Sequence, residues 1–260
     1  MKYGHFLLSL FIMKTREYNI IGLPETDSTN NYAVKVLKGS RPAEMTVVYT
    51  DYQTTGKGQQ GNAWYSGREE NLLFSVILYP KFLSAERQFY LSKVVSLGIC
   101  DALKQYLGEG LYIKWPNDIF YKSWKLGGIL IENSLMADKI DYTVAGVGIN
   151  INQTIFPDEL PNPISLMMIT KKGHERKKVL NDILNAIDNR YHQLKNRAYR
   201  RINDDYYSLL YKSHQHVQFN TPDTLFRARI SGVNETGELL LQLDNNEIRS
   251  FQFREVEFVV

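Results

Sequence analysis

The stretch LYIKWPNDIFYKSWKLGGILIENSLMADKIDYTVAGVGINI, residues 111–151, contains three strand-like apolar runs, at residues 111–114, 125–132 and 140–151. Only a few residues separate the runs, whereas two parallel strands need a long crossover between them. The stretch therefore predicts hairpins in a largely antiparallel or mixed sheet. The regular strand–helix alternation of a doubly wound fold is absent.

Upstream of this stretch, two more runs of β-branched and aromatic residues predict strands at residues 46–50 and 71–79. A glycine-rich loop lies between them. Apolar residues then recur at helical spacing from Ser84 to about Leu107. This spacing predicts a long packed helix with Ser84 as its N-cap and Gly108 as its stop.

Residues 171–201 carry ten Lys or Arg and three acidic residues, so a basic patch is one interpretation. The other is an amphipathic helix whose charges form a solvated face, and we favour it because the apolar positions follow a helical period. These positions are Val179, Ile183, Leu184, Ile187, Tyr191 and Leu194.

Beyond about Lys212 the pattern changes to short alternating strands, at residues 217–219, 225–230, 239–243 and 248–253. Turn-forming residues separate these strands, as in small β-barrels. We therefore predict two domains: a larger one over residues 1–211 and a small β-barrel-like one over residues 212–260.

The composition is that of an ordinary folded protein, with 260 residues, 43% of them apolar, and 31 basic against 28 acidic side chains. It excludes a disordered or fibrous chain. The single cysteine, Cys100, lies in an apolar run, which predicts a small buried side chain and a reducing, cytoplasmic compartment. The apolar run at residues 5–13 is too short to span a membrane. We hypothesise that translation starts at Met13, which would place the residues before it upstream of the true start.

The glycine-rich loop, Gly56-Lys57-Gly58-Gln59-Gln60-Gly61, matches the dinucleotide fingerprint G-x-G-x-x-G. That fingerprint requires a helix after the loop, and the turn-like residues that follow predict none, so a nicotinamide site is not expected. Three glycines still let backbone amides approach a phosphate, with Lys57 as a cation and Trp64 as a stacking face. The alternative is a plain hairpin loop.

Two other segments are dense in polar or small residues. Lys114-Trp115-Pro116-Asn117-Asp118 places a cation, an aromatic ring, an amide and a carboxylate between two strands, although Asn117 and Asp118 can equally be simple turn residues. Paired glycines open the run at 125–132, and Gly146-Val147-Gly148 repeats the arrangement ahead of Asn150. Glycine in a strand indicates that another group approaches the backbone closely.

These segments, together with Asp27-Ser28-Thr29-Asn30, resemble the biotin protein ligases in order and spacing from about Tyr18 to Asn152. The resemblance implies an α+β fold. Its catalytic domain would be related to class II aminoacyl-tRNA synthetases, with a mixed sheet flanked by helices, and a small SH3-like domain would follow it.

The resemblance also implies a role for each matching residue. Lys125 and Lys57 would be catalytic, Lys125 by reaching the biotin carboxylate and the α-phosphate. Biotin would be bound by Ser28, Thr29, Asn30, Gln53, Gly56, Lys57, Lys125, Gly128 and Gly146. ATP or the adenylate would be bound by Lys57, Gln59, Asn62, Trp64, Asn117, Asp118, Lys125 and Asn150.

The implied reaction is attachment of biotin to a lysine of a biotin carboxyl carrier protein through biotinyl-AMP. ATP and biotin are the substrates, and Mg²⁺ is expected to arrive with the ATP phosphates. We expect no metal site on the protein itself, since His214-Gln215-His216 is the only close histidine pair and indicates ordinary surface residues. The loop departs from relatives that carry several arginines, because Lys57, Gln59, Gln60 and Asn62 stand there, and we expect it to hold phosphate less strongly.

Two alternatives remain. A lipoate ligase shares the fold and acylates lysine, but its pocket does not need the polar set at 28–30 and Gln53. A repressor that also ligates would carry a DNA-binding domain of some 60 residues ahead of the catalytic domain. Only 26 residues precede Asp27, so we expect no nucleic-acid partner. The acceptor would be the carrier domain of acetyl-CoA carboxylase or a related carboxylase, and both a monomer and a homodimer stay open.

Overall fold

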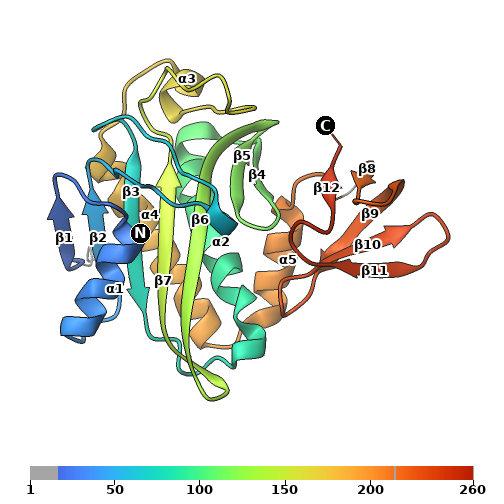
Figure 1. The fold of residues 1–260 in the computed structure, drawn as a ribbon, viewed down its shortest axis with the longest axis horizontal. Coiled ribbons are helices and arrows are strands. Elements are labelled where there is room, and N and C mark those ends of the chain that lie inside the picture. Colours follow the sequence, from blue (N-terminus) through green and yellow to red (C-terminus); the bar gives the residue numbers. More distant parts are fainter. Residues whose placement is uncertain (1–16, 214, 260) are drawn as a thin grey trace, which may run out of the picture.

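The computed structural model describes residues 17–213 and 215–259, apart from the side chain of Gln60. The proposed start at Met13, the apolar run at 5–13 and His214 lie outside the described residues. Figure 1 shows a large sheet with helices on both faces and a smaller sheet beside it. Within the described ranges, no helix is both long and apolar enough to cross a membrane.

The large sheet is mixed, as the sequence predicts. Only β1 and β2 pair in parallel, and the other neighbours are antiparallel. In spatial order its strands are β1 (Ile20–Leu23), β2 (Thr46–Thr50), β3 (Leu72–Leu78), β7 (Lys139–Ile149), β6 (Trp124–Met136), β5 (Asp118–Tyr121) and β4 (Leu111–Lys114). The sequence did not predict β1 or β5.

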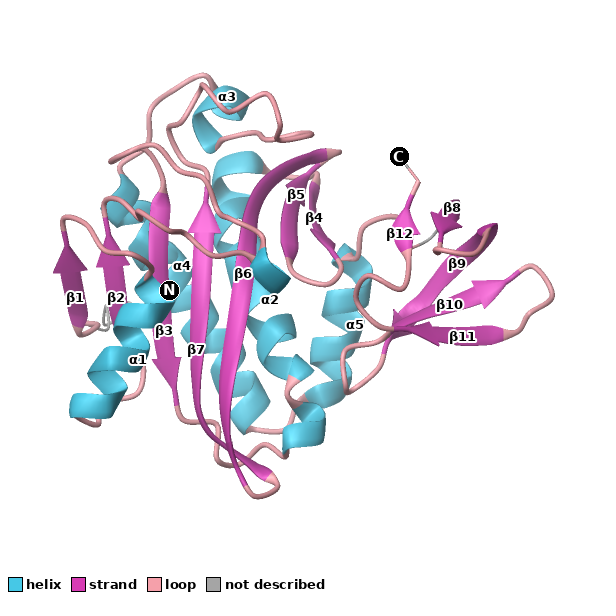
Figure 2. Ribbon diagram, viewed as in Figure 1, coloured by secondary structure: helices cyan, strands magenta, loops and turns pink. Residues whose placement is uncertain are grey.

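Helices cover the two faces of this sheet (Figure 2). On one face α1 (Thr29–Gly39) packs against β2, β3 and β7 through a small cluster centred on Ala33. The main core lies on the other face, under α2 (Phe89–Leu107), α4 (Arg176–Lys195) and α5 (Tyr199–Leu209). A short helix, α3 (Leu166–Thr170), follows β7.

The amphipathic interpretation of residues 171–201 is confirmed for α4, because all six apolar positions named above are buried. The helix ends at Lys195, and α5 begins at Tyr199 after a break. The burial predicted for Cys100 is also confirmed, and that burial raises the pKa of the thiol.

The predicted start of the long helix at Ser84 is wrong. Ser84 precedes a 3-10 turn, η2 (Ala85–Arg87), its side chain makes no capping hydrogen bond, and α2 begins only at Phe89. The physical reason is a tertiary contact, since Ser84 forms a bridge with Lys139 and the Ala85 amide donates to the Asp138 carbonyl. The predicted stop is confirmed, because Gly108 caps α2 with a φ of 67°.

The smaller sheet has five antiparallel strands, one more than predicted. In spatial order they are β11 (Ile248–Phe251), β10 (Leu239–Leu243), β9 (Leu225–Val233), β8 (His216–Asn220) and β12 (Glu257–Phe258). Over residues 215–259, no pairing joins the two edge strands, so closure of a barrel is not observed. The boundary between residues 211 and 212 lies between α5 and β8 and stays a prediction.

The contacts that attach the smaller sheet to the larger unit include two hydrogen bonds and an ion pair. The buried Lys93 ammonium donates to the Val233 carbonyl at 3.1 Å. The Trp115 indole donates to the Gly237 carbonyl at 2.8 Å. On the surface, Arg87 forms an ion pair with Glu235 at 3.1 Å. The Trp115 hydrogen bond holds the Lys114–Asp118 turn next to the smaller sheet.

Candidate active site

A cavity of about 320 Å³ opens between the sheet, the start of α1, the glycine-rich loop and the C-terminal strand. This volume suits a small-molecule site. The residues predicted for biotin and ATP line it, except Gly56 and Asn150. Segments more than 200 residues apart in the sequence therefore meet at one place.

One end of the cavity is neutral and polar. Ser28 is the N-cap of α1, Thr29 and Asn30 begin the helix, and all three are 2–4% exposed. The Gln53 side-chain oxygen accepts hydrogen bonds from the Thr29 amide at 2.8 Å and from its hydroxyl at 3.1 Å. The Ser28 side chain makes no capping bond to the helix. This end presents hydroxyl and amide groups without a charge, as recognition of a neutral polar ring requires.

Asn30 is fixed in this end by three hydrogen bonds. Its side-chain oxygen accepts from the Ser75 hydroxyl at 2.6 Å. Its amide nitrogen donates to Glu132 at 2.6 Å and to the Leu130 carbonyl at 3.3 Å. A Cβ added at Gly146 would lie 2.3 Å from the Asn30 side-chain oxygen. The glycine predicted to border a ligand thus makes room for a side chain that lines the cavity.

The cationic part of the cavity lies at β5 and β6. The Lys125 ammonium forms an ion pair with Asp118 at 2.7 Å. Between these strands the register shifts, so that Ile119 pairs with Gly127 while Phe120 pairs with Lys125. Such a bulge re-aims side chains, which accounts for Lys125 and Asp118 meeting at the cavity. Lys57 reaches the cavity from the loop and donates to Asn31 at 2.7 Å.

The glycine-rich loop folds as a hairpin with a short 3-10 turn, η1 (Gln59–Gly61), and no α-helix follows it, as expected. Trp64 lies across the glycines of the sheet, where a Cβ added at Gly148 would be 2.5 Å from its ring and one at Gly128 would be 3.1 Å away. The Trp64 indole nitrogen and the Gln59 side-chain oxygen are buried, and neither has a partner among the described residues.

Two further predicted asparagines, Asn117 and Asn150, tie loops to strands, whereas Asn62 lies in the cavity lining. Asn117 donates to the Ile129 carbonyl at 2.7 Å and fixes the turn before β5. Asn150 donates to the Ile164 carbonyl at 3.0 Å. Asn150 and Gly56 lie outside the cavity lining, with Gly56 packed against the Trp64 carbonyl and Gln53. Their direct contact with a ligand stays a prediction.

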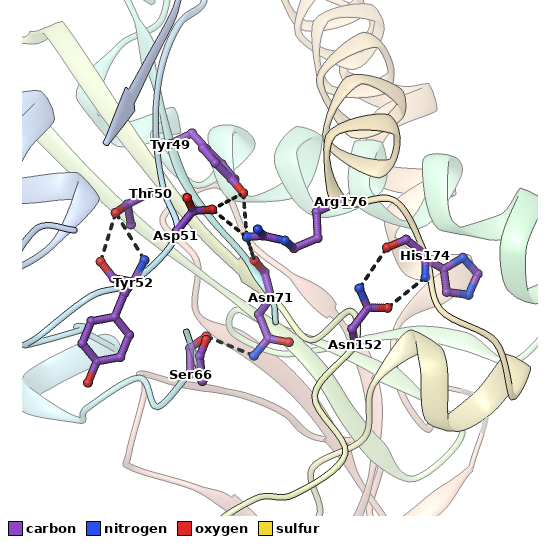
Figure 3. Close-up of polar contacts among 10 residues, drawn as sticks. Tyr49, Thr50, Asp51, Tyr52, Ser66, Asn71, Asn152, His174 and Arg176 are labelled. Carbon is purple, nitrogen blue, oxygen red and sulfur yellow. Dashed lines mark hydrogen bonds and ion pairs between the residues drawn. The ribbon is translucent and has the colours of Figure 1, made fainter. Parts of the chain in front are cut away.

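A polar network anchors both ends of the loop (Figure 3). Arg176, at the start of α4, forms an ion pair with Asp51 at 2.9 Å and donates to the Tyr49 hydroxyl at 2.7 Å. Burial raises the pKa of Tyr49 to about 12. The buried Asn71 donates to the Ser66 hydroxyl at 3.0 Å. Because Asp51 precedes the loop and Ser66 follows it, the network fixes the positions from which the loop leaves and re-enters the fold.

The structure adds cavity residues that the sequence did not single out. Lys114 and Gly148 belong to segments named above but were assigned no role. The C-terminal residues that line the cavity could not be predicted from local sequence patterns, because their position depends on how the smaller sheet packs against the larger unit. They are Phe253, Val256, Glu257 and Phe258.

Residues 22–150 match the family model described as the biotin/lipoate A/B protein ligase family. The chain is 28% identical to the bifunctional ligase/repressor BirA of Bacillus subtilis over 238 residues, which is 88% of this chain and 71% of that protein. It is 33% identical over 131 residues to the biotin–(acetyl-CoA-carboxylase) ligase of Paracoccus denitrificans, covering 50% of this chain and 53% of that protein.

Among solved structures, the biotin protein ligase from Aquifex aeolicus in complex with biotin and ATP is similar with a TM-score of 0.77 and 28% identity, over 93% of this chain and 98% of that one. The fold and cavity thus define a protein ligase of the biotin and lipoate class. Within that class, the chain belongs to the biotin protein ligase family.

Proposed function

We propose that this protein attaches biotin to a lysine of a carrier protein through a biotinyl-AMP intermediate. The observation that carries the proposal is the cavity itself. A neutral polar end at Ser28–Asn30 and a cationic pair at Lys125 and Lys57 line the same space as Trp64. Biotin has a polar ureido ring at one end and a carboxylate at the other, and ATP supplies a base that can stack on an aromatic face.

In the first step a biotin carboxylate oxygen attacks the α-phosphorus of ATP. A bond forms between that oxygen and the α-phosphorus, and the bond from the α-phosphorus to the bridging oxygen breaks, so pyrophosphate leaves with the electron pair. No proton is transferred. Negative charge concentrates around the α-phosphate, and Lys125 is positioned at the cavity to offset it. Asp118 orients Lys125 through their 2.7 Å ion pair.

In the second step the amine of the acceptor lysine attacks the carbonyl carbon of biotinyl-AMP. An amide bond forms, AMP leaves, and the amine loses a proton to solvent or to AMP. Since both nucleophiles come from substrates, the protein has to position them and exclude water. Trp64 and the glycine-rich loop cover the place where the reactive anhydride would lie.

Mg²⁺ is proposed to enter with the ATP phosphates. No group of three or more His, Cys, Asp or Glu side chains over residues 17–213 and 215–259 is arranged to hold a metal ion. The cavity does offer the Asp118 carboxylate, and Mg²⁺ commonly binds through one or two carboxylates together with phosphates and water. When bound, the ion would neutralise part of the phosphate charge.

The acceptor is proposed to be the biotin carboxyl carrier domain of an acetyl-CoA carboxylase or a related carboxylase. The Paracoccus denitrificans relative, and another from Mycobacterium tuberculosis, are named as biotin–(acetyl-CoA-carboxylase) ligases, which supports this choice. A cytoplasmic location, the lack of DNA binding and the choice between monomer and homodimer stay predictions from the sequence.

The test is biotin-dependent release of pyrophosphate from ATP by the purified protein, with lipoate and octanoate as alternative acids. Release with biotin alone, followed by transfer of biotin to a purified carrier domain, is the expected result. Release with lipoate instead would identify the protein as a lipoate ligase of the same fold. No release with any acid would refute the proposed first step.

A further inference from the structure

A second lysine, Lys114, lies at the cavity beside the Lys125–Asp118 pair. Lys114 is the last residue of β4, and the strand register places it directly opposite Asp118. Lys125 reaches the same Asp118 from β6. Asp118 on β5 thus lies between two lysines from the strands on either side, of which only Lys125 forms an ion pair with it, and both lysines line the cavity. Asp118 therefore compensates Lys125 directly but forms no ion pair with Lys114.

The surroundings of Lys114 differ from those of Lys125. Its ammonium lies 5.1 Å from the centroid of the Phe120 ring and 5.5 Å from that of Phe258, which belongs to β12 of the smaller sheet. Over the described residues the Lys114 side chain has no ion pair within 4.0 Å and no hydrogen bond, and burial lowers its pKa. The nearby charges are Asp118 and Glu257, which favour the ammonium, and Lys125 and Lys212, which oppose it.

A half-buried ammonium without a close anion is costly to keep in a folded protein. The cost is recovered when an anion binds beside it in a site with little water. The cavity is expected to receive two anions, the biotin carboxylate and the ATP triphosphate, while Lys125 already has Asp118 as its partner. The unpaired donors of Lys114 are therefore free for the second anion.

We propose that Lys114 is a catalytic residue that binds the β- and γ-phosphates of ATP and stabilises the departing pyrophosphate. The assignment rests on the proposed function and names a residue for its first step. As the bond between the α-phosphorus and the bridging oxygen breaks, charge grows on the pyrophosphate oxygens, and the Lys114 ammonium offsets it. Phe120 and Phe258 hold the side chain between two apolar rings, so the smaller sheet supplies one wall of the phosphate site.

The test uses the full chain with Lys114→Met, and with Lys212→Met as the matched control. Lys212 contributes to the electrostatic environment of Lys114 but does not line the cavity. Binding of inorganic pyrophosphate with Mg²⁺, measured by calorimetry, is expected to weaken about 10-fold or more in Lys114→Met. The biotin-dependent exchange of pyrophosphate into ATP is expected to slow by about 100-fold. Lys212→Met should match the wild type in both.

A second reaction separates a phosphate-binding role from a structural one. Supplied biotinyl-AMP bypasses pyrophosphate release, so its transfer to a carrier lysine should stay within about twofold of the wild type in Lys114→Met. Lys114→Arg, which keeps the charge, should retain pyrophosphate binding. Equal loss of exchange and transfer, or unchanged pyrophosphate binding in Lys114→Met, would overturn the assignment.

The calorimetric measurement does not require biotin chemistry. If the wild type shows no biotin-dependent exchange but its pyrophosphate binding still depends on Lys114, the proposed function is refuted and the phosphate site is supported. Where Lys114→Met lowers the thermal midpoint by several degrees, Lys114→Gln repeats the binding measurement with a polar replacement, and its unchanged pyrophosphate binding would again overturn the assignment.

Discussion

Replacing Gly146 by alanine would push directly on the polar end of the cavity. Gly146 lies within β7, and a Cβ there would be 2.3 Å from the Asn30 side-chain oxygen and 2.9 Å from its Cγ. Ordinary contacts begin near 3.4 Å, so the Asn30 side chain must retreat by about 1 Å. The strand cannot move instead, because β7 is hydrogen-bonded on both sides, to β3 and β6.

A retreat of that size breaks or lengthens the hydrogen bonds that fix Asn30. Its bond to the Leu130 carbonyl is already 3.3 Å long and would exceed hydrogen-bond length, while the 2.6 Å bonds to Ser75 and Glu132 would lengthen. Each is worth about 1 kcal/mol, which gives a loss of up to about 3 kcal/mol in the free energy of unfolding. If biotin bonds to the same side chain, loss of that one bond, worth about 1 kcal/mol, would lower its affinity by about fivefold.

The assay is the KM for biotin in pyrophosphate release, together with the thermal midpoint. Gly22→Ala in β1 is the matched control, because nothing lies within 4 Å of a Cβ added there. Combining Gly146→Ala with Asn30→Ala removes the clash, so the double variant should lose less stability than the two single variants added together. An unchanged KM and midpoint in Gly146→Ala would refute the packing of Asn30 against this glycine.

Three further predictions follow from the site and its surroundings. Lys125→Ala should lower biotin-dependent pyrophosphate release by 100-fold or more, and near-normal release would exclude its role. Arg176→Met should lower the free energy of unfolding by about 2 kcal/mol in urea titration, because the Asp51 carboxylate loses a partner, while the neighbouring Lys177→Met should change it little. Lys93 is 2% exposed with a pKa lowered by burial to about 8 from 10.5, so the folded state binds fewer protons between these pH values. Wild type should therefore gain up to about 3 kcal/mol over Lys93→Met as pH rises through that window, and a difference that does not change with pH would contradict it.

Local patterns predicted the strongly patterned elements well. The strands at 46–50 and 111–114 match β2 and β4 to the residue, since each is bounded by turn-formers. Gly108 ends α2 because a left-handed φ favours glycine. The missed strands are short. β1 has four residues at the edge of the sheet, and β5 begins at Asp118 within a motif whose Asn-Asp pair is also typical of a turn.

The site was less accessible to sequence reasoning than the fold. Glycine in the strands indicated that something approaches the backbone, and the approaching groups are the side chains of Trp64 and Asn30. Composition cannot supply the identity of such partners, because they come from distant segments. The same limit applies to the helix start at Ser84, where a contact with the β6–β7 hairpin overrides the local capping preference.

The geometry gives the smaller sheet a specific connection to the reacting groups. Trp115 is hydrogen-bonded to the Gly237 carbonyl and adjoins Lys114 in the sequence, while Phe258 packs beside the Lys114 ammonium. A shift of this sheet would therefore move both the turn that carries Asp118 and one wall of the proposed phosphate site. Asn30 and Gln53 are fixed by α1 and the large sheet and would not follow. Perturbing the interface should thus affect the use of ATP more than the recognition of biotin.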